Sequence, residues 1–330
     1  MSILAYLFAI LKNVVYGTTV FFTGNLTETT SVMDVLALRF LLSFLAMWLL
    51  KMLRIIKVNV GVKDLFSRNS PRRPFMTALI LTGIFEPVLY MFFETMGVSM
   101  SSNVTTAVIL SLSPITSCIF EAVFLKERST WLQRIFLGIG IVGVVYIAVM
   151  TNTTSGKDSV VGILFLLGAV VSGSLFATFS RKASGHFNAM EVTYVSAMLG
   201  AVAFNAINIV RHLINGTILH YFDPFFKLEN LIPFFVLAVV STIVATGMNN
   251  FALGRMQPST MAAFSGLSTL VTIAVGVIFN DEKLMYFHFI GLVLILTRMI
   301  GVSAIAIRRD RKRARERMAE AERSDGISKE

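Results

Sequence analysis

Two ionisable residues lie inside long apolar stretches of the sequence. Lys12 stands about ten residues into the first stretch, and Glu86 stands about thirteen residues into the third. A charged side chain in such a segment is costly to bury, so it usually faces a cavity or a partner. At 1.5 Å per residue the two lie at similar depths, roughly 15 and 20 Å. They could anchor the opposite charges of one small molecule, or they could form a structural ion pair with each other.

Two prolines interrupt apolar stretches that carry polar groups. Pro87 directly follows Glu86, and Pro114 lies near the middle of residues 103–125. Proline lacks an N–H donor and crowds the carbonyl four residues earlier, so each is expected to kink a helix. A bend beside a carboxylate suits a gate. Glu86, Pro87 and Pro114 are therefore the expected coupling and gating residues.

Four further charged residues fall within apolar stretches and are expected to be structural. Arg39 and Glu94 lie at similar depths in the second and third stretches and are expected to pair as a clasp. Glu121 and Arg298 lie toward the inner ends of their stretches. Snorkelling to the surface or pairing is the expected role of both.

The composition indicates a polytopic membrane protein. The chain is 55% hydrophobic and 15% charged, with a mean hydropathy of +0.75, whereas ordinary soluble proteins are about 25% charged. The single Cys118 offers neither an intramolecular disulfide nor a metal-binding spacing. Apolar runs long enough to cross a bilayer predict ten spans, near residues 3–24, 33–53, 74–96, 103–125, 130–150, 160–181, 189–211, 231–253, 257–279 and 285–307.

The distribution of Lys and Arg predicts the orientation. With the N-terminus inside, 22 of the 29 basic residues fall on inner segments, at inner ends of spans or in the tail 308–330. This positive-inside bias places both termini in the cytoplasm and accounts for the net charge of +10 without nucleic acid. Lys12 lies within the first apolar run, which lacks an Ala-x-Ala site, so we expect a retained span rather than a signal peptide. The basic tail is expected to form a short helix on the anionic inner leaflet.

The sequence repeats with an offset of 155 residues. Residues 103–128 and 258–283 share Thr, Ala, Leu, Ser, Phe and Glu at six corresponding positions. Ten spans in two copies give five per copy, and an odd number inverts the second copy. We therefore predict an all-α membrane protein with ten transmembrane helices as a 5+5 inverted repeat and a site near the midplane. The predicted units are residues 1–150, residues 151–307 and a cytoplasmic basic tail at 308–330.

These features resemble a known family. The run Ser-Leu-Ser-Pro-Ile at 111–115, with Gly97-Val98 before it and Phe-Leu-Lys-Glu-Arg at 124–128 after it, resembles the EamA module of the drug/metabolite transporter superfamily. The resemblance covers about residues 3 to 307 as two tandem units. The second copy departs from the pattern, with Thr242 and Thr269 where the first has Pro87 and Pro114, so the two copies are expected to bend unequally.

The resemblance implies a central cavity lined by spans 1, 3, 4, 6, 8 and 9, with spans 5 and 10 peripheral. When these lining spans are carried over to this sequence by position, the resemblance suggests ten substrate-binding residues in addition to Lys12 and Glu86. Each of them could instead be a helix-packing residue, because small polar side chains commonly join membrane helices. The ten are Asn13, Tyr16, Tyr90, Ser111, Ser113, Ser172, Phe176, Asn249, Ser265 and Ser268.

The sequence lacks the constellations of an enzyme. Its aspartates fall in loops, in the tail or at span edges, and no nucleophile motif or phosphate-binding loop is present. We expect a secondary transporter in the cytoplasmic membrane, in contact with lipids, that moves a small metabolite by alternating access without a cofactor or a metal. Spans 3 and 4 would rock against spans 8 and 9.

One expected substrate class and two alternatives follow from these residues. A lysine and a glutamate at one depth suit a zwitterion, so an amino acid or related amine is expected, as the resemblance also implies. Proton-coupled export follows if Glu86 changes protonation near neutral pH. A multidrug or lipophilic-cation exporter with Glu86 as the counter-charge is the first alternative, and a non-transporting receptor or scaffold is the second.

Overall fold

The computed structural model describes residues 3–59, 73–100, 109–110, 112–126, 130–151, 159–279 and 286–327, and the regular secondary structure in these ranges is helical. Within them, seven helices contain a segment long and apolar enough to cross a bilayer. The prediction of an all-α, multi-pass membrane protein is confirmed. Ten spans were predicted. The three predicted spans that do not correspond to one of these seven helices fall on apolar helices that are shorter or interrupted.

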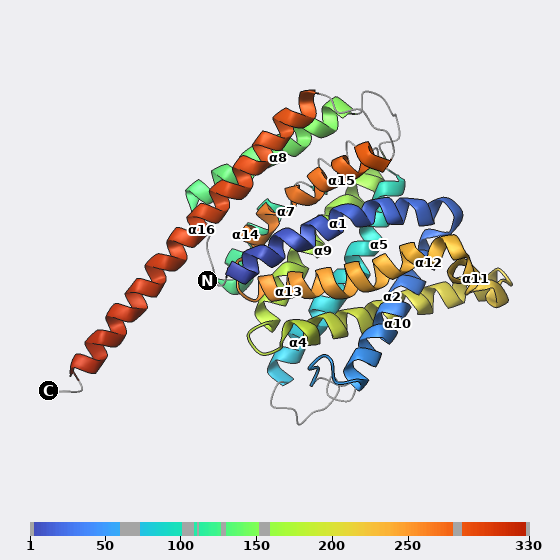
Figure 1. Cartoon of the computed structure of the whole chain (residues 1–330), viewed down its shortest axis with the longest axis horizontal. Coiled ribbons are helices and arrows are strands. Elements are labelled where there is room, and N and C mark those ends of the chain that lie inside the picture. Colours follow the sequence, from blue (N-terminus) through green and yellow to red (C-terminus); the bar gives the residue numbers. More distant parts are fainter. Residues whose placement is uncertain are drawn as a thin grey trace.

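The first half of the chain begins with two long helices and continues through a broken third one (Figure 1). The side chain of Ser31 caps the second helix by accepting a hydrogen bond from the Asp34 amide at 3.3 Å. The predicted fourth span begins outside the described residues. The elements are α1 (Ile3–Thr29), α2 (Val32–Met52), α4 (Arg73–Gly83), η1 (Ile84–Leu89), α5 (Tyr90–Ser99), α7 (Ser113–Phe120), η2 (Glu121–Leu125) and α8 (Trp131–Thr151).

The second half has the same general plan, and its second long helix begins with a capping box. Asn188 accepts from the Glu191 amide at 2.9 Å, and the Glu191 carboxylate accepts from the Asn188 amide at 2.9 Å. The elements are α9 (Val160–Ala183), α10 (Ala189–Ile214), η3 (Ile218–His220), α11 (Asp223–Phe226), α12 (Leu228–Phe235), η4 (Val236–Ala245), α13 (Thr246–Leu253), α14 (Pro258–Ala263), α15 (Gly266–Phe279) and α16 (Tyr286–Ile327).

Irregular segments interrupt one long helix in each half. In η1, Glu86 is extended, with φ −144° and ψ 122°, because the proline that follows disfavours helical backbone. The kink predicted at Pro87 is confirmed. In η4, the helix widens to π geometry over ten residues, and the Thr242 hydroxyl donates to the Leu237 carbonyl five residues earlier at 2.8 Å. The sequence signal for a hinge was confined to the first copy, whereas the structure interrupts both.

Pro114 has a different effect from the one expected. It lies in the first turn of α7, just after a turn at Leu112. The first-turn N–H groups of a helix have no partner within that helix, so proline is accommodated there without a break. The interruption of this segment therefore falls before Pro114 rather than at it.

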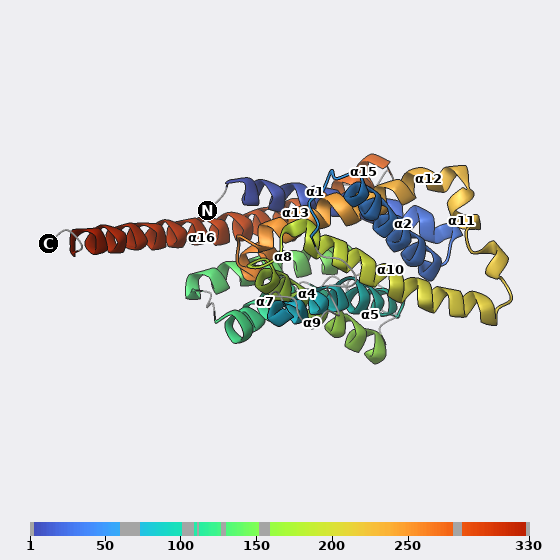
Figure 2. The same cartoon turned by 90° about the horizontal axis from the view of Figure 1, so that it is seen from below.

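The two halves exchange their first helices. Helix α1 packs against α13, α15 and η4 of the second half, and α9 packs against α4, α5 and α7 of the first half. Figures 1 and 2 show α1 beside α13 and α15 and show α9 beside α4, α5 and α7. The molecule therefore contains two mixed bundles, each with one helix from the opposite half.

Helices α2 and α10 form a long pair that joins the two halves. In its middle, the rings of Phe40 and Phe204 stack with centroids 5.5 Å apart. The Asn205 amide donates to the Ala37 carbonyl at 3.0 Å and accepts from the Tyr221 hydroxyl at 2.6 Å. The pair is thus held by side chains along its length.

A buried polar cluster closes one end of this pair, and we term it the outer clasp because it lies at the end that the sequence predicts to be outside the cytoplasm. The Asp34 carboxylate accepts hydrogen bonds from the Ser31 hydroxyl at 2.5 Å, the Asn208 amide at 2.9 Å and His212 Nε2 at 2.7 Å. The Arg211 guanidinium lies 3.6 Å from the same carboxylate and donates to the Ser31 hydroxyl at 2.6 Å. The outer clasp therefore joins the start of α2 to the end of α10.

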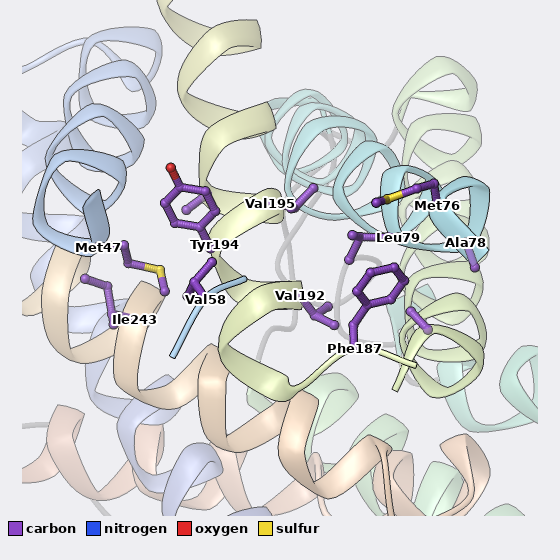
Figure 3. Close-up of a cluster of buried hydrophobic side chains, with 12 residues drawn as sticks. Met47, Val58, Met76, Ala78, Leu79, Phe187, Val192, Tyr194, Val195 and Ile243 are labelled. Carbon is purple, nitrogen blue, oxygen red and sulfur yellow. The ribbon is translucent and has the colours of Figure 1, made fainter. Parts of the chain in front are cut away.

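An apolar cluster occupies the opposite end of the pair (Figure 3). Met47 of α2 and Ile243 of η4 lie near Tyr194 of α10, while Leu79 of α4 lies near Phe187, just before α10. These buried side chains come from both halves. Packing here and hydrogen bonding at the outer clasp fix α2 against α10 at both ends.

Helix α16 continues from its apolar segment into the basic tail as one helix of 42 residues. Helix α8 packs along its first part, and its C-terminal part projects beyond the bundle (Figure 1). The tail was predicted to form a short helix on the inner leaflet that frays to disorder. It extends the axis of α16 instead, because no proline interrupts a segment rich in Arg, Ala and Glu, which are strong helix formers.

Candidate functional site

A cavity of about 810 Å³ lies between the two mixed bundles. Its walls come from both halves of the chain, namely from α1, α2, η1, α5, α7, α9, α10, η4, α13, α14 and α15. Among the described residues, α8 and α16 contribute none to its lining, which agrees with the expectation of peripheral fifth and tenth spans. Helices α2 and α10, the predicted second and seventh spans, also line the cavity, although the expected lining did not include them.

Ten of the twelve predicted binding residues line this cavity. Ser172 is buried beside the lining face of α9, which is formed by Gly173, Ser174, Phe176 and Ala177. Ser111 lies outside the described residues. Of the two predicted hinge residues, Pro87 lines the cavity, whereas Pro114 is buried away from it. The ten are Lys12, Asn13, Tyr16, Glu86, Tyr90, Ser113, Phe176, Asn249, Ser265 and Ser268.

Lys12 and Glu86 both face the cavity without binding each other directly. Lys12 is 8% exposed, and its ammonium lies 5.2 Å from the centre of the Tyr16 ring. Among the described residues, neither side chain forms an ion pair or a hydrogen bond. The structural alternative of a closed Lys12–Glu86 pair is therefore not what the structure contains.

Hydrogen bonds hold the neighbours of Lys12 in place. The Asn13 amide donates to the Ala9 carbonyl at 2.6 Å, and the Tyr16 hydroxyl lies 3.1 Å from the Thr246 hydroxyl of α13. The Tyr16–Thr246 contact joins α1 to the second half. Hydrogen bonds thus hold the side chains of Asn13 and Tyr16 in place, whereas no hydrogen bond to a described residue holds the Lys12 ammonium.

The predicted clasp between Arg39 and Glu94 is wrong. Arg39 Nε donates to the Thr242 hydroxyl and Arg39 Nη2 donates to the Ser241 hydroxyl, each at 3.0 Å. Glu94 instead accepts from the Tyr90 hydroxyl at 2.8 Å. Both charged groups line the cavity. The error arose because similar depth on two helices does not show which way a side chain points.

The cavity runs along α1 toward one end of the molecule. Its lining includes Thr19, Thr23 and Thr27, which recur at intervals of four residues on one face of the helix, and Val32 at the start of α2. From Lys12 to Thr27 the path covers about 22 Å at 1.5 Å per residue. The threonine spacing was present in the sequence and could have identified this wall.

The other end of the cavity is closed by packing and by polar contacts between the two bundles. An apolar cluster that includes Ala9, Phe176 and Met261 is buried there. Arg181 of α9 donates to the Gly254 carbonyl after α13 at 2.6 Å, and the Glu121 carboxylate accepts from the Ser259 amide at 3.0 Å. The cavity is thus closed at the end where α9 and α13 terminate.

The two remaining charged residues lie away from the cavity. Glu121 is 0% exposed, and its bond to the Ser259 amide agrees with the expected pairing role. Arg298 is 1% exposed and does not snorkel, because it is enclosed by α8 near Gly140 and by α15 near Gly266. Neither residue lines the candidate site.

A multi-pass helical bundle around a central cavity, with charged side chains in a largely apolar wall, is an architecture typical of membrane transporters. The chain belongs to the EamA-like transporter family, whose model matches residues 3–149 and again 160–304. The two matches also suggest an internal repeat. Membership of this family agrees with the expectation that the protein is not an enzyme.

Individual relatives agree with this assignment. The chain is 32% identical over 297 residues to the uncharacterized transporter YcxC of Bacillus subtilis (strain 168), which covers 90% of this chain and 92% of that protein. It is 23% identical over 228 residues to the uncharacterized transporter YvbV of the same organism, covering 68% and 70%. A crystal structure of another protein matches with a TM-score of 0.68 at 15% identity, covering 92% of this chain and 98% of that one, and shows the fold alone.

Proposed function

We propose that this protein is a secondary carrier of a small zwitterion, an amino acid or a related amine, across the cytoplasmic membrane. One observation carries the proposal. Lys12 and Glu86 line the same cavity with opposite charges and are not bound to each other. A carboxylate of the substrate would meet the ammonium of Lys12, and an amine of the substrate would meet the carboxylate of Glu86.

The energetics favour an occupant with both charges. A hydrogen bond to a charged group contributes about 1.5–3 kcal/mol. Two such contacts together supply about 3–6 kcal/mol, which is a large part of the about 4–8 kcal/mol that millimolar to micromolar affinity requires. An uncharged molecule would leave both charged groups without a partner of opposite charge.

The proposed architecture is ten spans in a 5+5 inverted repeat, with units at residues 1–150 and 151–307 and both termini in the cytoplasm. The family model matches twice, and the interruptions coincide after the offset of 155. The shift carries η1, residues 84–89, onto residues 239–244, which lie inside η4. Equivalent breaks in two copies support a common ancestral unit with a flexible centre.

The packing suggests which parts move during alternating access. Each half contributes its first helix to the other bundle, so the moving bodies are the two mixed bundles rather than the two halves. One contains α1, η4, α13 and α15, and the other contains α4, η1, α5, α7 and α9. Pro87 and the π-helical η4 supply the bends, and Glu86 beside Pro87 couples protonation to the movement. We propose that a proton gradient drives export through this movement.

Reconstitution into liposomes tests the proposed function. Uptake of labelled amino acids and amines would be measured with and without a pH gradient for the wild type and for Lys12→Ala, with Lys182→Ala as the control. Lys182 is an exposed lysine at the end of α9, away from the cavity. Saturable amino-acid flux that fails only in Lys12→Ala supports the zwitterion carrier. Absence of flux for every zwitterion would refute it.

A second candidate is a carrier of lipophilic cations. It is favoured by the apolar side chains of Phe40, Met91, Phe176 and Met261, which share the cavity wall with Glu86. In that case, cationic dyes would be transported and would compete with one another, and Lys12→Ala would leave their flux unchanged. Comparing competition by amino acids with competition by cationic dyes separates the two candidates.

A further inference from the structure

We propose that Arg39 is a positioning residue that links the charge of Glu86 to the π-helical geometry of η4. Protonation of Glu86 and bending of η4 are then one event, transmitted by the guanidinium of Arg39. This role rests on the proposed function, in which Glu86 carries the proton, and it supplies the route by which that charge reaches the bundle containing η4.

Arg39 of α2 binds two neighbouring hydroxyl groups of η4. Its Nε donates to Thr242 and its Nη2 donates to Ser241, each at 3.0 Å. A guanidinium is planar and holds its N–H groups in a fixed fork, so two such bonds set the orientation of the helix as well as its distance. Arg39 therefore connects the cavity wall directly to the irregular helix.

Two hydroxyl groups of η4 make bonds that are specific to the π-helical geometry. The Thr242 hydroxyl donates to the Leu237 carbonyl at 2.8 Å, and the Thr246 hydroxyl donates to the Ser241 carbonyl at 3.3 Å. Both carbonyls lie five residues earlier, which is the spacing of hydrogen bonds in a π-helix. In an α-helix a threonine hydroxyl donates three or four residues back, as Thr178 does in α9. The two bonds would therefore be lost if η4 became α-helical.

The Thr242 hydroxyl joins the guanidinium to this geometry. A hydroxyl has one proton to donate, and Thr242 donates it to Leu237 while accepting a hydrogen bond from Arg39. Bonds that share one hydroxyl strengthen each other, because each polarises it. Withdrawal of Arg39 would weaken the bond to Leu237 and make the π-helical geometry of η4 less stable.

The charge on Glu86 acts on the same guanidinium. Arg39 lines the cavity with Glu86 and Glu94 and is attracted electrostatically to both, yet in the described part of the chain it forms no ion pair with either. Ionised Glu86 draws Arg39 away from η4, whereas neutral Glu86 leaves Arg39 on the hydroxyls of η4. Protonation of Glu86 therefore favours the π-helical geometry. The charged and titratable groups that act on or respond to Glu86 are Lys12, Arg39, Glu94, Tyr16 and Tyr90.

Hydrogen–deuterium exchange of the full-length protein in lipid nanodiscs tests this role. Amide exchange of residues 236–245 would be followed by mass spectrometry below and above neutral pH and corrected for the intrinsic effect of pH on exchange. In the wild type we expect roughly tenfold faster exchange at the higher pH, as the loss of one bond from a charged donor implies. Glu86→Gln should exchange slowly at both pH values, and Arg39→Gln should exchange fast at both.

Ser43 provides a matched control for a merely structural role. Its hydroxyl also joins α2 to η4, donating to the Ala238 carbonyl at 2.9 Å. Ser43→Ala removes that link but leaves the Arg39 guanidinium and its two partners in place, so it should keep the pH response of η4. A pH response that persists in Arg39→Gln, or one that is lost equally in Ser43→Ala, would overturn the proposal.

The outcomes also separate this role from the proposed function. Amino-acid flux that depends on pH, without a pH response in the exchange of η4, would overturn the role of Arg39 and leave the carrier function intact. Absence of flux for every zwitterion, with the expected pH response, would refute the proposed substrate and support the link from Glu86 to η4. If Arg39→Gln does not fold, Thr242→Val removes the shared hydroxyl at nearly constant shape, and an unchanged pH response in that variant would overturn the proposal.

Discussion

Replacing Asp34 by Asn should weaken the outer clasp between α2 and α10 while changing almost nothing in shape. The carboxylate accepts three hydrogen bonds and lies 3.6 Å from Arg211. The amide keeps one carbonyl oxygen but loses the negative charge. It also presents an NH₂ group toward side chains that currently act as donors.

The expected loss in the free energy of unfolding follows from the hydrogen bonds that Asp34 accepts in the outer clasp. A hydrogen bond to a charged group contributes about 1.5–3 kcal/mol, against about 0.5–1.5 kcal/mol for a neutral one. The difference is about 1 kcal/mol per bond, so the three bonds together predict a loss of about 3 kcal/mol in the free energy of unfolding. This corresponds to a change of roughly 150-fold in the folding equilibrium.

The chain contains its own control for this estimate. His220 Nδ1 lies 2.7 Å from Asp223, the same distance as His212 Nε2 from Asp34. The first pair is 71% and 59% exposed, whereas the second is 11% and 12% exposed. Exposed pairs contribute little because water screens them, so Asp223→Asn should lower stability by only about 0.5 kcal/mol.

The assay is equilibrium unfolding of both variants in mixed micelles, followed by circular dichroism. A loss several times larger for Asp34→Asn than for Asp223→Asn is the expected result. Equal losses would refute the reasoning, because they would mean that burial and the additional donors contribute nothing to the outer clasp.

Three further predictions concern transport and packing. Glu86→Gln should abolish the pH dependence of flux in liposomes while leaving the thermal unfolding temperature unchanged, and a retained pH dependence would exclude Glu86 as the proton carrier. Gly17→Ala should destabilise the protein by about 1–3 kcal/mol because a Cβ there would overlap Val271 of α15, whereas Gly138→Ala, where nothing lies within 4 Å, should be neutral in the same unfolding assay. Reporter fusions at the two ends of the chain should both report the cytoplasm, and opposite signals would contradict an even number of spans.

Much of the fold could be predicted from the sequence because the thickness of the bilayer sets a minimum length for each apolar helix that crosses it. The apolar runs identified most of the long helices, and Pro87 identified the interruption beside Glu86, since proline acts on its own backbone. The π-helical η4 had no such signal. It depends on how Thr242 and its neighbours pack against α1 and α2, which no local pattern records.

The sequence predicted how deep the charged residues of the candidate site lie within their spans, but it did not predict which way their side chains point. Lys12 and Glu86 were recognised because a charge in an apolar run is rare, and both line the cavity. Arg39 and Glu94 carried the same signal, yet their partners were assigned from depth alone. Their actual partners, Ser241 and Tyr90, are ordinary polar residues with no feature that distinguishes them in the sequence.

The exchange of first helices between the halves has a consequence for synthesis in the cell. Tyr16 of α1 binds Thr246, which lies 230 residues later in the chain. At about 5–20 residues per second, the ribosome needs roughly 10 to 45 s to deliver that partner. During this interval the nascent α1 stands in the bilayer with Lys12 facing lipid or the insertion machinery. We therefore expect truncated chains that end before η4 to leave this helix without its partners and to be substrates for membrane quality control.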